Sequence, residues 1–258
     1  MATETVCAKC GGSGFIIVEG ATVSSARRCD CALQGRAVRM EDRAQIPPLY
    51  RNASFDNFLL PEGNPVARSA LSRVMIAVQA FVRDFPHETR PGLLLVGDSG
   101  TGKTHLAVAA LRRIIEKGFE CLFWDYQHLL DRIFAGYDAN SNSSDKQAYQ
   151  LALDTEVLLL DDLGSQRGSD WVEDTVTRII TWRCNNRKPV IATTNLPDVA
   201  AGSTIVQRNE LLNKVEHRRT LAEQIGTRAR SRLFEMCTVI QMPAIEDYRV
   251  QLQKSRKY

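Results

Sequence analysis

The sequence predicts an α/β fold with a central parallel β-sheet, preceded by a small cysteine-rich module. Residues 97–104, GDSGTGKT, match the phosphate-loop pattern G-x-x-x-x-G-K-[ST] at every fixed position. An apolar run at 93–96 precedes this loop, and apolar residues at helical spacing follow it up to Gly118. Strand, glycine loop and helix form the context that the pattern requires. We therefore expect a cysteine-rich module with a linker helix at 1–45 and a nucleotide-binding domain at 46–258.

Composition and charge exclude several classes of protein. The chain of 258 residues is 44% hydrophobic and 24% charged, as is typical of soluble globular proteins. No apolar run approaches the ~20 residues that cross a bilayer. The first residues lack the basic region and apolar core of a secretion signal. We therefore expect a cytoplasmic protein that does not bind membranes. A net charge of +3 is too small to indicate nucleic-acid binding by itself.

Four of the seven cysteines lie in the first 31 residues as two close pairs. Glycines and a short apolar run between the pairs indicate a hairpin. Two thiolate pairs at the ends of a hairpin can close a tetrahedral zinc site, and so short a segment needs a metal to fold. The alternatives are a redox pair or unstructured cysteines. The predicted zinc ligands are Cys7, Cys10, Cys29 and Cys31, whereas Cys121, Cys184 and Cys237 are expected to be small core side chains.

The segment between the cysteine pairs and the phosphate loop predicts a linker and a helix. Residues 36–43 are charged and Pro47-Pro48 breaks the chain beyond them, so residues 32–50 are expected to form a linker or a short helix. Apolar residues from Leu71 to Phe85 recur at helical spacing and trace one face of a helix. Such a face is most simply explained as part of the core.

The phosphate loop and the helix that follows predict a site for a nucleotide and Mg²⁺. Glycines allow backbone N–H groups to turn inward around the β-phosphate, and the helix N-terminus adds its positive dipole end. Lys103 is expected to reach the β- and γ-phosphates, and the Thr104 hydroxyl to hold Mg²⁺. The predicted nucleotide-binding residues of this segment are Gly97, Ser99, Gly100, Thr101, Gly102, Lys103, Thr104 and His105.

Four apolar runs after the phosphate loop predict strands, and two of them end in polar side chains. The run at 157–160 ends in Asp161 and Asp162, like the Mg²⁺-organising motif of phosphate-loop NTPases. Asp161 is expected to bind the metal, directly or through water, and Asp162 to orient the attacking water. The run at 189–195 ends in Asn195. Because parallel strands end at one edge, Asn195 is expected to hold that water, although a strand-terminating turn is the alternative. The other runs are 121–124 and 239–242.

Polar segments connect these elements. Residues 136–145 are rich in turn formers and predict a surface loop. Residues 170–187 predict a helix, with Asp170 and Glu173 placed as a capping box.

The stretch 207–232 is strongly charged, with seven Lys or Arg and three Glu. Arg228 and Arg232 are four residues apart and share one helix face. This face is either solvated or completes the nucleotide site of a neighbouring subunit, where an arginine neutralises charge on the γ-phosphate.

The order of the motifs resembles one group of AAA+ ATPases. The phosphate loop is followed by LLLLDDLG, IATTN, TRARSRLFEMC and EDYR. This order resembles the replicative helicase loaders of the DnaC/DnaI type and the IstB transposition helpers, over about residues 46–252. RNASFDNF, at 51–58, also resembles the segment that precedes the ATPase fold in these proteins. The resemblance implies a three-layer AAA+ sandwich. The segment CAKCGGSGF…RRCDC is similar to the zinc modules of DnaI-like loaders, which IstB-type proteins usually lack.

The resemblance also implies roles for single residues. Asn195 falls on the sensor, Arg232 on the arginine finger, Arg228 on its supporting arginine and Arg249 on a second arginine sensor. A longer charged stretch at 208–219 than the family pattern contains leaves the finger open among Arg228, Arg230 and Arg232. In such loaders the corresponding regions line a pore for single-stranded DNA. Here these residues are Tyr137, Ser169 and Trp171, with packing of Trp171 in the core as the alternative.

The resulting hypothesis is an ATP-dependent loader of the hexameric replicative DNA helicase. The resemblance implies ATP, Mg²⁺ and Zn²⁺ as cofactors, binding of the helicase through the zinc module, and self-association of AAA+ domains on single-stranded DNA. Asp162, where many AAA+ motors have the longer glutamate, is compatible with slow hydrolysis. The alternatives are an IstB-like transposition helper that binds DNA and recruits a transposase, and a nucleotide-gated adaptor that hardly turns over.

Overall fold

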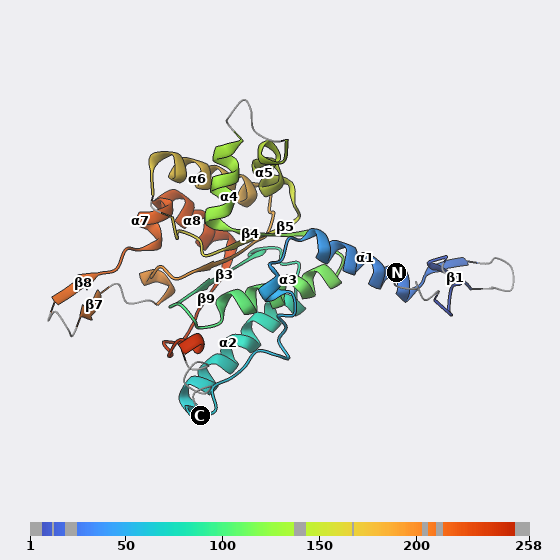
Figure 1. Cartoon of the computed structure of the whole chain (residues 1–258), viewed down its shortest axis with the longest axis horizontal. Coiled ribbons are helices and arrows are strands. Elements are labelled where there is room, and N and C mark those ends of the chain that lie inside the picture. Colours follow the sequence, from blue (N-terminus) through green and yellow to red (C-terminus); the bar gives the residue numbers. More distant parts are fainter. Residues whose placement is uncertain are drawn as a thin grey trace.

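The main domain is built on a five-stranded parallel sheet. The computed structural model describes residues 7–11, 13–18, 25–136, 143–166, 168–202, 206–209 and 214–250. The strand order is β4-β5-β6-β3-β9, so the strand before the phosphate loop lies between two others (Figure 1). The predicted strands are confirmed to within two residues. They are β3 (Gly92–Val96), β4 (Cys121–Asp125), β5 (Val157–Asp161), β6 (Val190–Thr194) and β9 (Cys237–Gln241).

Helices cover both faces of this sheet. Side chains alternate along β3, so Leu93 and Leu95 belong to the core on one face, whereas Leu94 and Val96 belong to the core on the other. A strand buried on both faces is expected to be a continuous apolar run, as this one is. The predicted three-layer AAA+ sandwich is therefore confirmed. The helices are α2 (Pro65–Arg83) and α3 (Lys103–Glu116) on one face, and α4 (Tyr126–Ala135), α5 (Ser143–Asp154), α6 (Asp170–Asn185), α7 (Leu221–Ile225) and α8 (Thr227–Met236) on the other.

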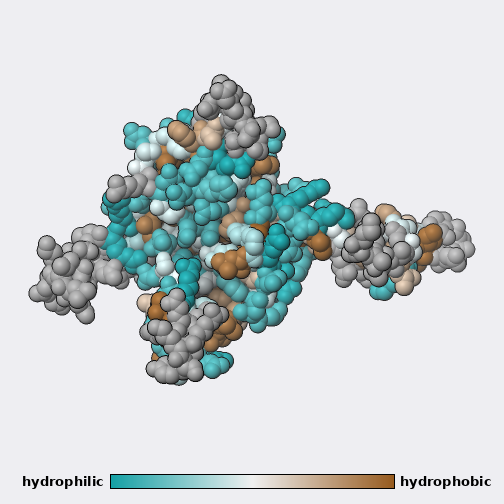
Figure 2. All heavy atoms as spheres, in the orientation of Figure 1, coloured by the Kyte–Doolittle hydropathy of each residue, from teal (hydrophilic) through white to brown (hydrophobic). Residues whose placement is uncertain are grey.

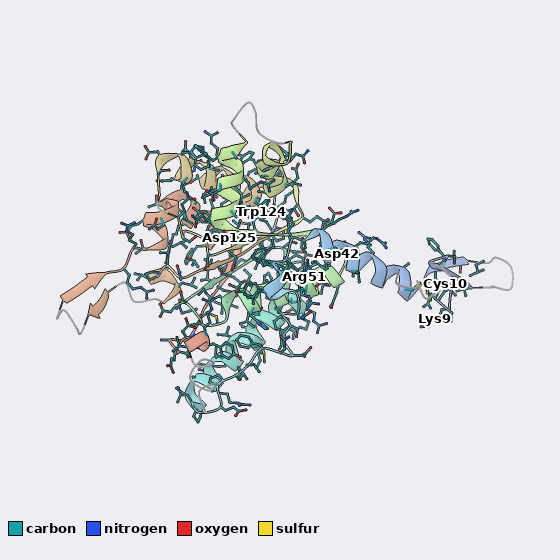
Figure 3. All side chains as sticks on the ribbon, viewed as in Figure 1. Lys9, Cys10, Asp42, Arg51, Trp124 and Asp125 are labelled. Atoms are coloured by element: carbon teal, nitrogen blue, oxygen red, sulfur yellow. The ribbon has the colours of Figure 1, made fainter. Side chains whose placement is uncertain are left out.

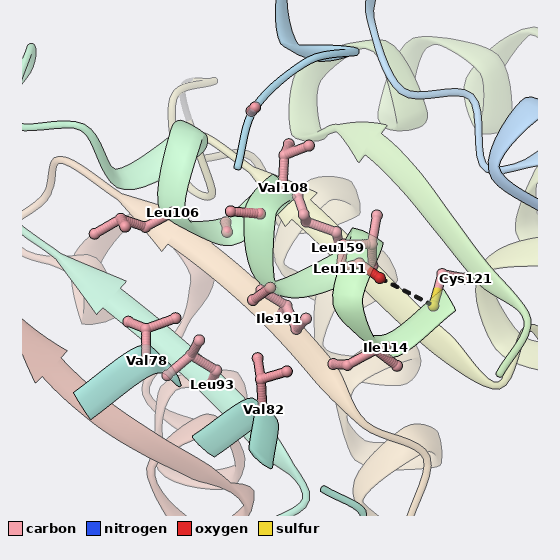
Figure 4. Close-up of a cluster of buried hydrophobic side chains, with 14 of the residues drawn as sticks. Val78, Val82, Leu93, Leu106, Val108, Leu111, Ile114, Cys121, Leu159 and Ile191 are labelled. Carbon is pink, nitrogen blue, oxygen red and sulfur yellow. Dashed lines mark hydrogen bonds between the residues drawn. The ribbon is translucent and has the colours of Figure 1, made fainter. Parts of the chain in front are cut away.

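The core beneath the phosphate loop is densely apolar. Figure 4 shows Val78 and Val82 of α2 beside Leu93 of β3, with the apolar side chains of α3 above them. The predicted helix face is thus core, and α3 is held along its length against the sheet. The Cys121 thiol donates to the Leu111 carbonyl, and Cys121 and Cys237 are buried as expected, whereas Cys184 is half-buried.

The N-terminal module lies at the end of a long helix and projects from the main domain (Figure 1). It contains the antiparallel strands β1 (Phe15–Val18) and β2 (Ser25–Arg28), followed by α1 (Asp30–Arg43). The expected linker or short helix is therefore a 14-residue helix. Figure 2 shows hydrophobic atoms on this module, where Phe15, Ile17 and Val18 are exposed.

The helix α1 belongs to both parts of the chain. Met40 in its last turn and Ala44, its C-cap, belong to the core of the main domain, and the backbone N–H of Phe123 donates to the Ala44 carbonyl at 2.8 Å. Arg112 of α3 also donates to the Glu41 carboxylate at 2.7 Å. The division of the chain at residue 45 stays a prediction.

The charged stretch after β6 forms a hairpin. It contains β7 (Val206–Asn209) and β8 (Lys214–His217), paired antiparallel, and it projects on the opposite side from the N-terminal module (Figure 1). The short 3-10 helices η1 (Pro48–Tyr50) and η2 (Val199–Ala201) complete the elements.

Two local expectations are corrected. The helix α5 begins at Ser143, inside the predicted loop at 136–145, of which 137–142 lie outside the described residues. The N-cap of α6 is Ser169, whose hydroxyl accepts from the Val172 N–H, so the capping box on Asp170 is wrong. Within the described ranges, every helix is too short or too polar to span a bilayer.

A buried arginine joins α6 to the strands. Arg183 is fully buried, and its guanidinium donates to five backbone carbonyls. Burial lowers its pKa to about 9, so the group remains charged at neutral pH. Because these carbonyls come from the end of α5 and from the residues just before β5 and β6, one side chain fixes three elements. They belong to Ala152, Leu153, Thr155, Glu156 and Pro189.

Candidate nucleotide site

The phosphate loop lies between β3 and α3, with two glycines in conformations that other residues rarely adopt. Gly102 is the N-cap of α3 and has φ of 92°, and a Cβ there would lie 2.5 Å from the Phe58 ring. Gly100 has φ of 74°, and a Cβ there would lie 2.0 Å from the Asp247 carboxylate. The loop therefore needs glycine both for its backbone turn and for the close approach of two distant segments.

Lys103 is held beneath the loop. Its side chain is 6% exposed, and its ammonium donates to the Asp98 carbonyl at 2.8 Å. Desolvation lowers the pKa of Lys103, and the nearby carboxylates of Asp162, Asp161 and Asp98 oppose this shift. The amine is thus a buried cation surrounded by acidic groups, which suits it to bind phosphate oxygens.

Asp161 is the last residue of β5, and its carboxylate accepts hydrogen bonds from two hydroxyl groups. The Thr104 hydroxyl donates to its Oδ1 at 2.9 Å, and the Thr193 hydroxyl donates to the same oxygen at 2.6 Å. Burial raises the pKa of Asp161, and the hydrogen bond from Thr193 lowers it in part. Adjacent oxygen ligands of octahedral Mg²⁺ lie about 2.9 Å apart. Thr104 and Asp161 therefore fit as neighbouring ligands of the predicted Mg²⁺.

A cavity of about 980 Å³ opens beside these groups. Its size is in the range of ligand pockets. Asp161 and Asp162 line it at the phosphate-loop end, together with Thr104. An apolar wall, which the sequence patterns did not reveal, completes it. That wall consists of Tyr50, Phe58, Leu60 and Ile245.

The other predicted nucleotide-binding residues lie at or beside this cavity. Ser99 and Arg249 line it, and the backbone N–H of Tyr248 donates to the Gly100 carbonyl at 3.2 Å. The His105 ring lines it too and faces the Phe58 ring edge-on, 5.4 Å between centroids. The described lining does not include Asn195, which lies one residue beyond β6.

Arg218 is a residue that the patterns missed at this site. It follows β8 directly, and its guanidinium donates to Asp98 Oδ1 at 2.7 Å and to the Asn195 carbonyl at 3.2 Å. The base of the hairpin is thereby attached to the phosphate loop. No local pattern could reveal a contact between residues 120 positions apart.

The three arginines of α8 have different surroundings. Arg230 makes two hydrogen bonds to the Asp198 carboxylate and lies over the Phe234 ring. Arg228 is exposed, and Arg232 pairs with Glu235 on the same helix at the surface. Since Arg230 is engaged within its own chain, Arg228 and Arg232 are the better candidates for a finger that reaches a neighbour.

The expected DNA-binding residues are only partly brought together. Trp171 is half-buried against the core, and the exposed Phe134 ring meets it edge-on at 5.4 Å. Ser169 is exposed and caps α6. Tyr137 lies outside the described residues. Trp171 therefore packs partly into the core, and its contact with single-stranded DNA stays a prediction.

The four N-terminal cysteines converge. Their sulfur atoms all lie within 4.8 Å of one another, with Cys7 and Cys29 at 3.9 Å and Cys10 and Cys31 at 3.3 Å. Sulfurs around tetrahedral zinc lie about 3.8 Å apart. The hydrogen bond with Cys10 raises the pKa of the Cys31 thiol, so the thiol form is favoured without a metal. Binding of a metal would displace the thiol protons and leave thiolates. Figure 3 labels Cys10 in this module, far from Trp124 and Asp125 in the main domain. The donor set fits zinc.

Changing Cys10 and Cys31 together to Ser is expected to abolish zinc binding, because it removes two of the four thiolates. The wild-type protein should carry about one zinc ion per chain, measured by elemental analysis. Cys184→Ser, which alters a half-buried cysteine of α6, should leave the zinc content unchanged. Full zinc content in the double variant would exclude this site.

A family model places the chain among known proteins. The model described as IstB-like ATP binding protein matches residues 74–249. The chain belongs to this family. The IstB-like match covers the phosphate loop, the two aspartates and the arginines of α8, and it confirms the expected DnaC/IstB group of AAA+ ATPases.

Individual proteins are also similar to this IstB-like chain. The replicative helicase loader DnaC of Escherichia coli (strain K12) is 24% identical over 190 residues, 70% of this chain and 74% of that protein. The uncharacterized protein YqaM of Bacillus subtilis (strain 168) is 25% identical over 197 residues, and the match spans 60% of its length. A crystal structure of the DnaC helicase loader matches 76% of this chain and 100% of its own at 32% identity, with a TM-score of 0.59. A DnaI structure at 18% identity, with a TM-score of 0.54, shares the fold.

Proposed function

We propose that this protein is an ATP-dependent loader of a replicative DNA helicase. One observation carries the proposal: a phosphate loop and two aspartates that line one cavity occur together with a projecting module whose four cysteines converge. The DnaC loaders supply the supporting resemblance, since they match most of the main domain. The cysteine module, at the N-terminal end of α1, is the part that binds the helicase.

The nucleotide site supports hydrolysis of ATP. Lys103 donates to the β- and γ-phosphate oxygens, and Thr104 and Asp161 hold Mg²⁺, which neutralises phosphate charge when bound. Asp162 accepts a hydrogen bond from the attacking water. The water oxygen bonds to the γ-phosphorus as the bond from that phosphorus to the β–γ bridging oxygen breaks. ADP and inorganic phosphate leave, and the water proton passes to solvent.

Neighbouring subunits complete the site. Arg228 and Arg232 lie on α8, apart from the cavity lining of their own chain. In a side-by-side assembly they reach the γ-phosphate held by the adjacent subunit, where an arginine is worth orders of magnitude in rate. Arg249, which lines the cavity, contacts the phosphates from within the same chain. Trp171 and Ser169, together with Tyr137, contact single-stranded DNA.

A transposition helper is the second candidate, and the family match itself favours it. Such a protein would use the same ATP site to bind duplex DNA and recruit a transposase. The four-cysteine module weighs against it, because IstB-type proteins usually lack one.

Light scattering after size exclusion tests the proposal. The protein is mixed with the replicative helicase of its own source in ATP and Mg²⁺. A defined complex is expected, and it should be lost when Cys7 and Cys10 are changed to Ser, but retained in Cys184→Ser. Absence of a complex, together with ATP-dependent binding to duplex DNA, would replace the loader by the transposition helper.

A further inference from the structure

We propose that Thr193 is a positioning residue that sets both active-site carboxylates through one hydroxyl group. This inference rests on one part of the proposed function, namely that the protein hydrolyses ATP. Thr193 does not line the cavity and is fully buried, so it acts through Asp161 and Asp162.

The hydroxyl uses both its donor and its acceptor capacity. It donates to Asp161 Oδ1 at 2.6 Å and accepts the backbone N–H of Asp162 at 3.0 Å. Thr193 belongs to β6, which pairs in parallel with β5 on one side and β3 on the other. A residue on the neighbouring strand thereby fixes the carboxylate that ends β5 and the first residue of the turn beyond it.

The turn after β5 needs such support. Asp162 has φ of 53°, a left-handed conformation that is costly for a residue with a side chain. This conformation turns the chain so that Asp162 lines the cavity. The hydrogen bond from its N–H to Thr193 holds that conformation, and the Leu163 N–H adds a bond to the Thr193 carbonyl at 2.8 Å.

Thr193 and Thr104 both hold the Asp161 carboxylate by hydrogen bonds. Both hydroxyls donate to Oδ1. Thr104 would also serve as a ligand of Mg²⁺, and its position depends on the phosphate loop. Thr193 keeps the carboxylate in place, because its position on a buried strand does not depend on the phosphate loop. A hydrogen bond to a charged group inside a protein is stronger than one between neutral groups.

Three variants separate the hydroxyl from the shape of the side chain. Thr193→Val keeps the branched shape and removes the hydroxyl, whereas Thr193→Ser keeps the hydroxyl. Thr194→Val is the comparator on the same strand. Thr194 is equally buried, and its hydroxyl donates to the Leu163 carbonyl and accepts the Leu196 N–H, so it also loses two hydrogen bonds.

ATP hydrolysis is measured as kcat and KM at saturating Mg²⁺, and then as a function of Mg²⁺ concentration. Thr193→Val is expected to lower kcat about tenfold or more and to raise the half-saturating Mg²⁺ concentration, with KM for ATP changed less than about twofold. Thr193→Ser should remain within about threefold of wild type in kcat. Thr194→Val should lower thermal stability about as much as Thr193→Val does, but should lower kcat much less. If Thr193→Val does not fold, Thr193→Cys, a weaker donor of similar size, replaces it.

Several outcomes would overturn the inference. It fails if Thr193→Val keeps the wild-type kcat and Mg²⁺ requirement, if Thr193→Ser does not restore them, or if Thr194→Val loses as much. These results leave the proposed function intact. If the wild type itself does not hydrolyse ATP, the proposed function fails instead. Thr193 is then tested by measuring how the binding of a fluorescent ATP analogue depends on the Mg²⁺ concentration. A binding curve of Thr193→Val identical to that of the wild type overturns the inference, and a weaker Mg²⁺ dependence supports it.

Discussion

Replacing Lys103 by alanine is expected to lower kcat/KM for ATP hydrolysis on the order of a hundredfold or more, as removal of a single charged donor at a reacting centre does. Lys103 is 6% exposed, and its ammonium lies near the carboxylates of Asp161 and Asp162. Without this cation, the incoming phosphates would meet uncompensated negative charge in a region shielded from water. Steady-state release of phosphate, with and without single-stranded DNA, measures the loss.

The matched control is Arg113→Ala on the same helix. Arg113 is half-exposed and pairs with Asp56 and Glu116 at the surface, so its removal should change hydrolysis little. Thermal unfolding of both variants shows whether they are folded. Hydrolysis by a folded Lys103→Ala variant within threefold of wild type would mean that the phosphate loop does not form the active site.

Replacing Arg183 by methionine is expected to lower the free energy of unfolding by about 3 kcal/mol or more. The guanidinium donates to five carbonyls in the protein interior, and methionine replaces only the aliphatic part of the side chain and has no donors. Each carbonyl left without a partner in the interior adds a cost. Urea unfolding followed by circular dichroism measures the difference.

Arg178→Met provides the comparison, because Arg178 lies on the same helix α6 and its side chain is 72% exposed. It pairs with Asp174 only at the surface, so the change should be within about 0.5 kcal/mol. Equal effects of the two substitutions would show that helix propensity, and not the buried network, sets the stability of this region.

Local patterns were sufficient for the strands of the central sheet, the phosphate loop and the cysteine pairs. The run Leu93 to Val96 is apolar at every position because both faces of β3 are buried, so it is visible without knowledge of the fold. Lys103 and Thr104 follow from the loop, since their roles depend on a turn that neighbouring residues specify. The hydrogen bond from Thr104 to Asp161 follows once the parallel strands are placed side by side.

Contacts between distant segments were not predictable in this way. Thr193 follows the apolar residues of a buried strand, and only the register between β5 and β6 brings its hydroxyl to Asp161. Arg230 could not be distinguished from Arg228 or Arg232 by spacing, because its partner Asp198 lies in a different segment. The hairpin β7–β8 was missed because its short strands, VQRN and KVEH, are too polar to stand out.

The ion pair between Arg218 and Asp98 makes the hairpin and the nucleotide site parts of one thermodynamic cycle. A partner that holds the hairpin in a different position when nucleotide is bound must change nucleotide affinity by the same factor as nucleotide changes the affinity for that partner. Both side chains are partly exposed, at 32% and 51%, so solvent limits the strength of the pair. Exposed pairs contribute at most about 1 kcal/mol, which corresponds to a coupling of about fivefold. Through this contact the hairpin would tune nucleotide affinity in small steps and would not switch it on or off.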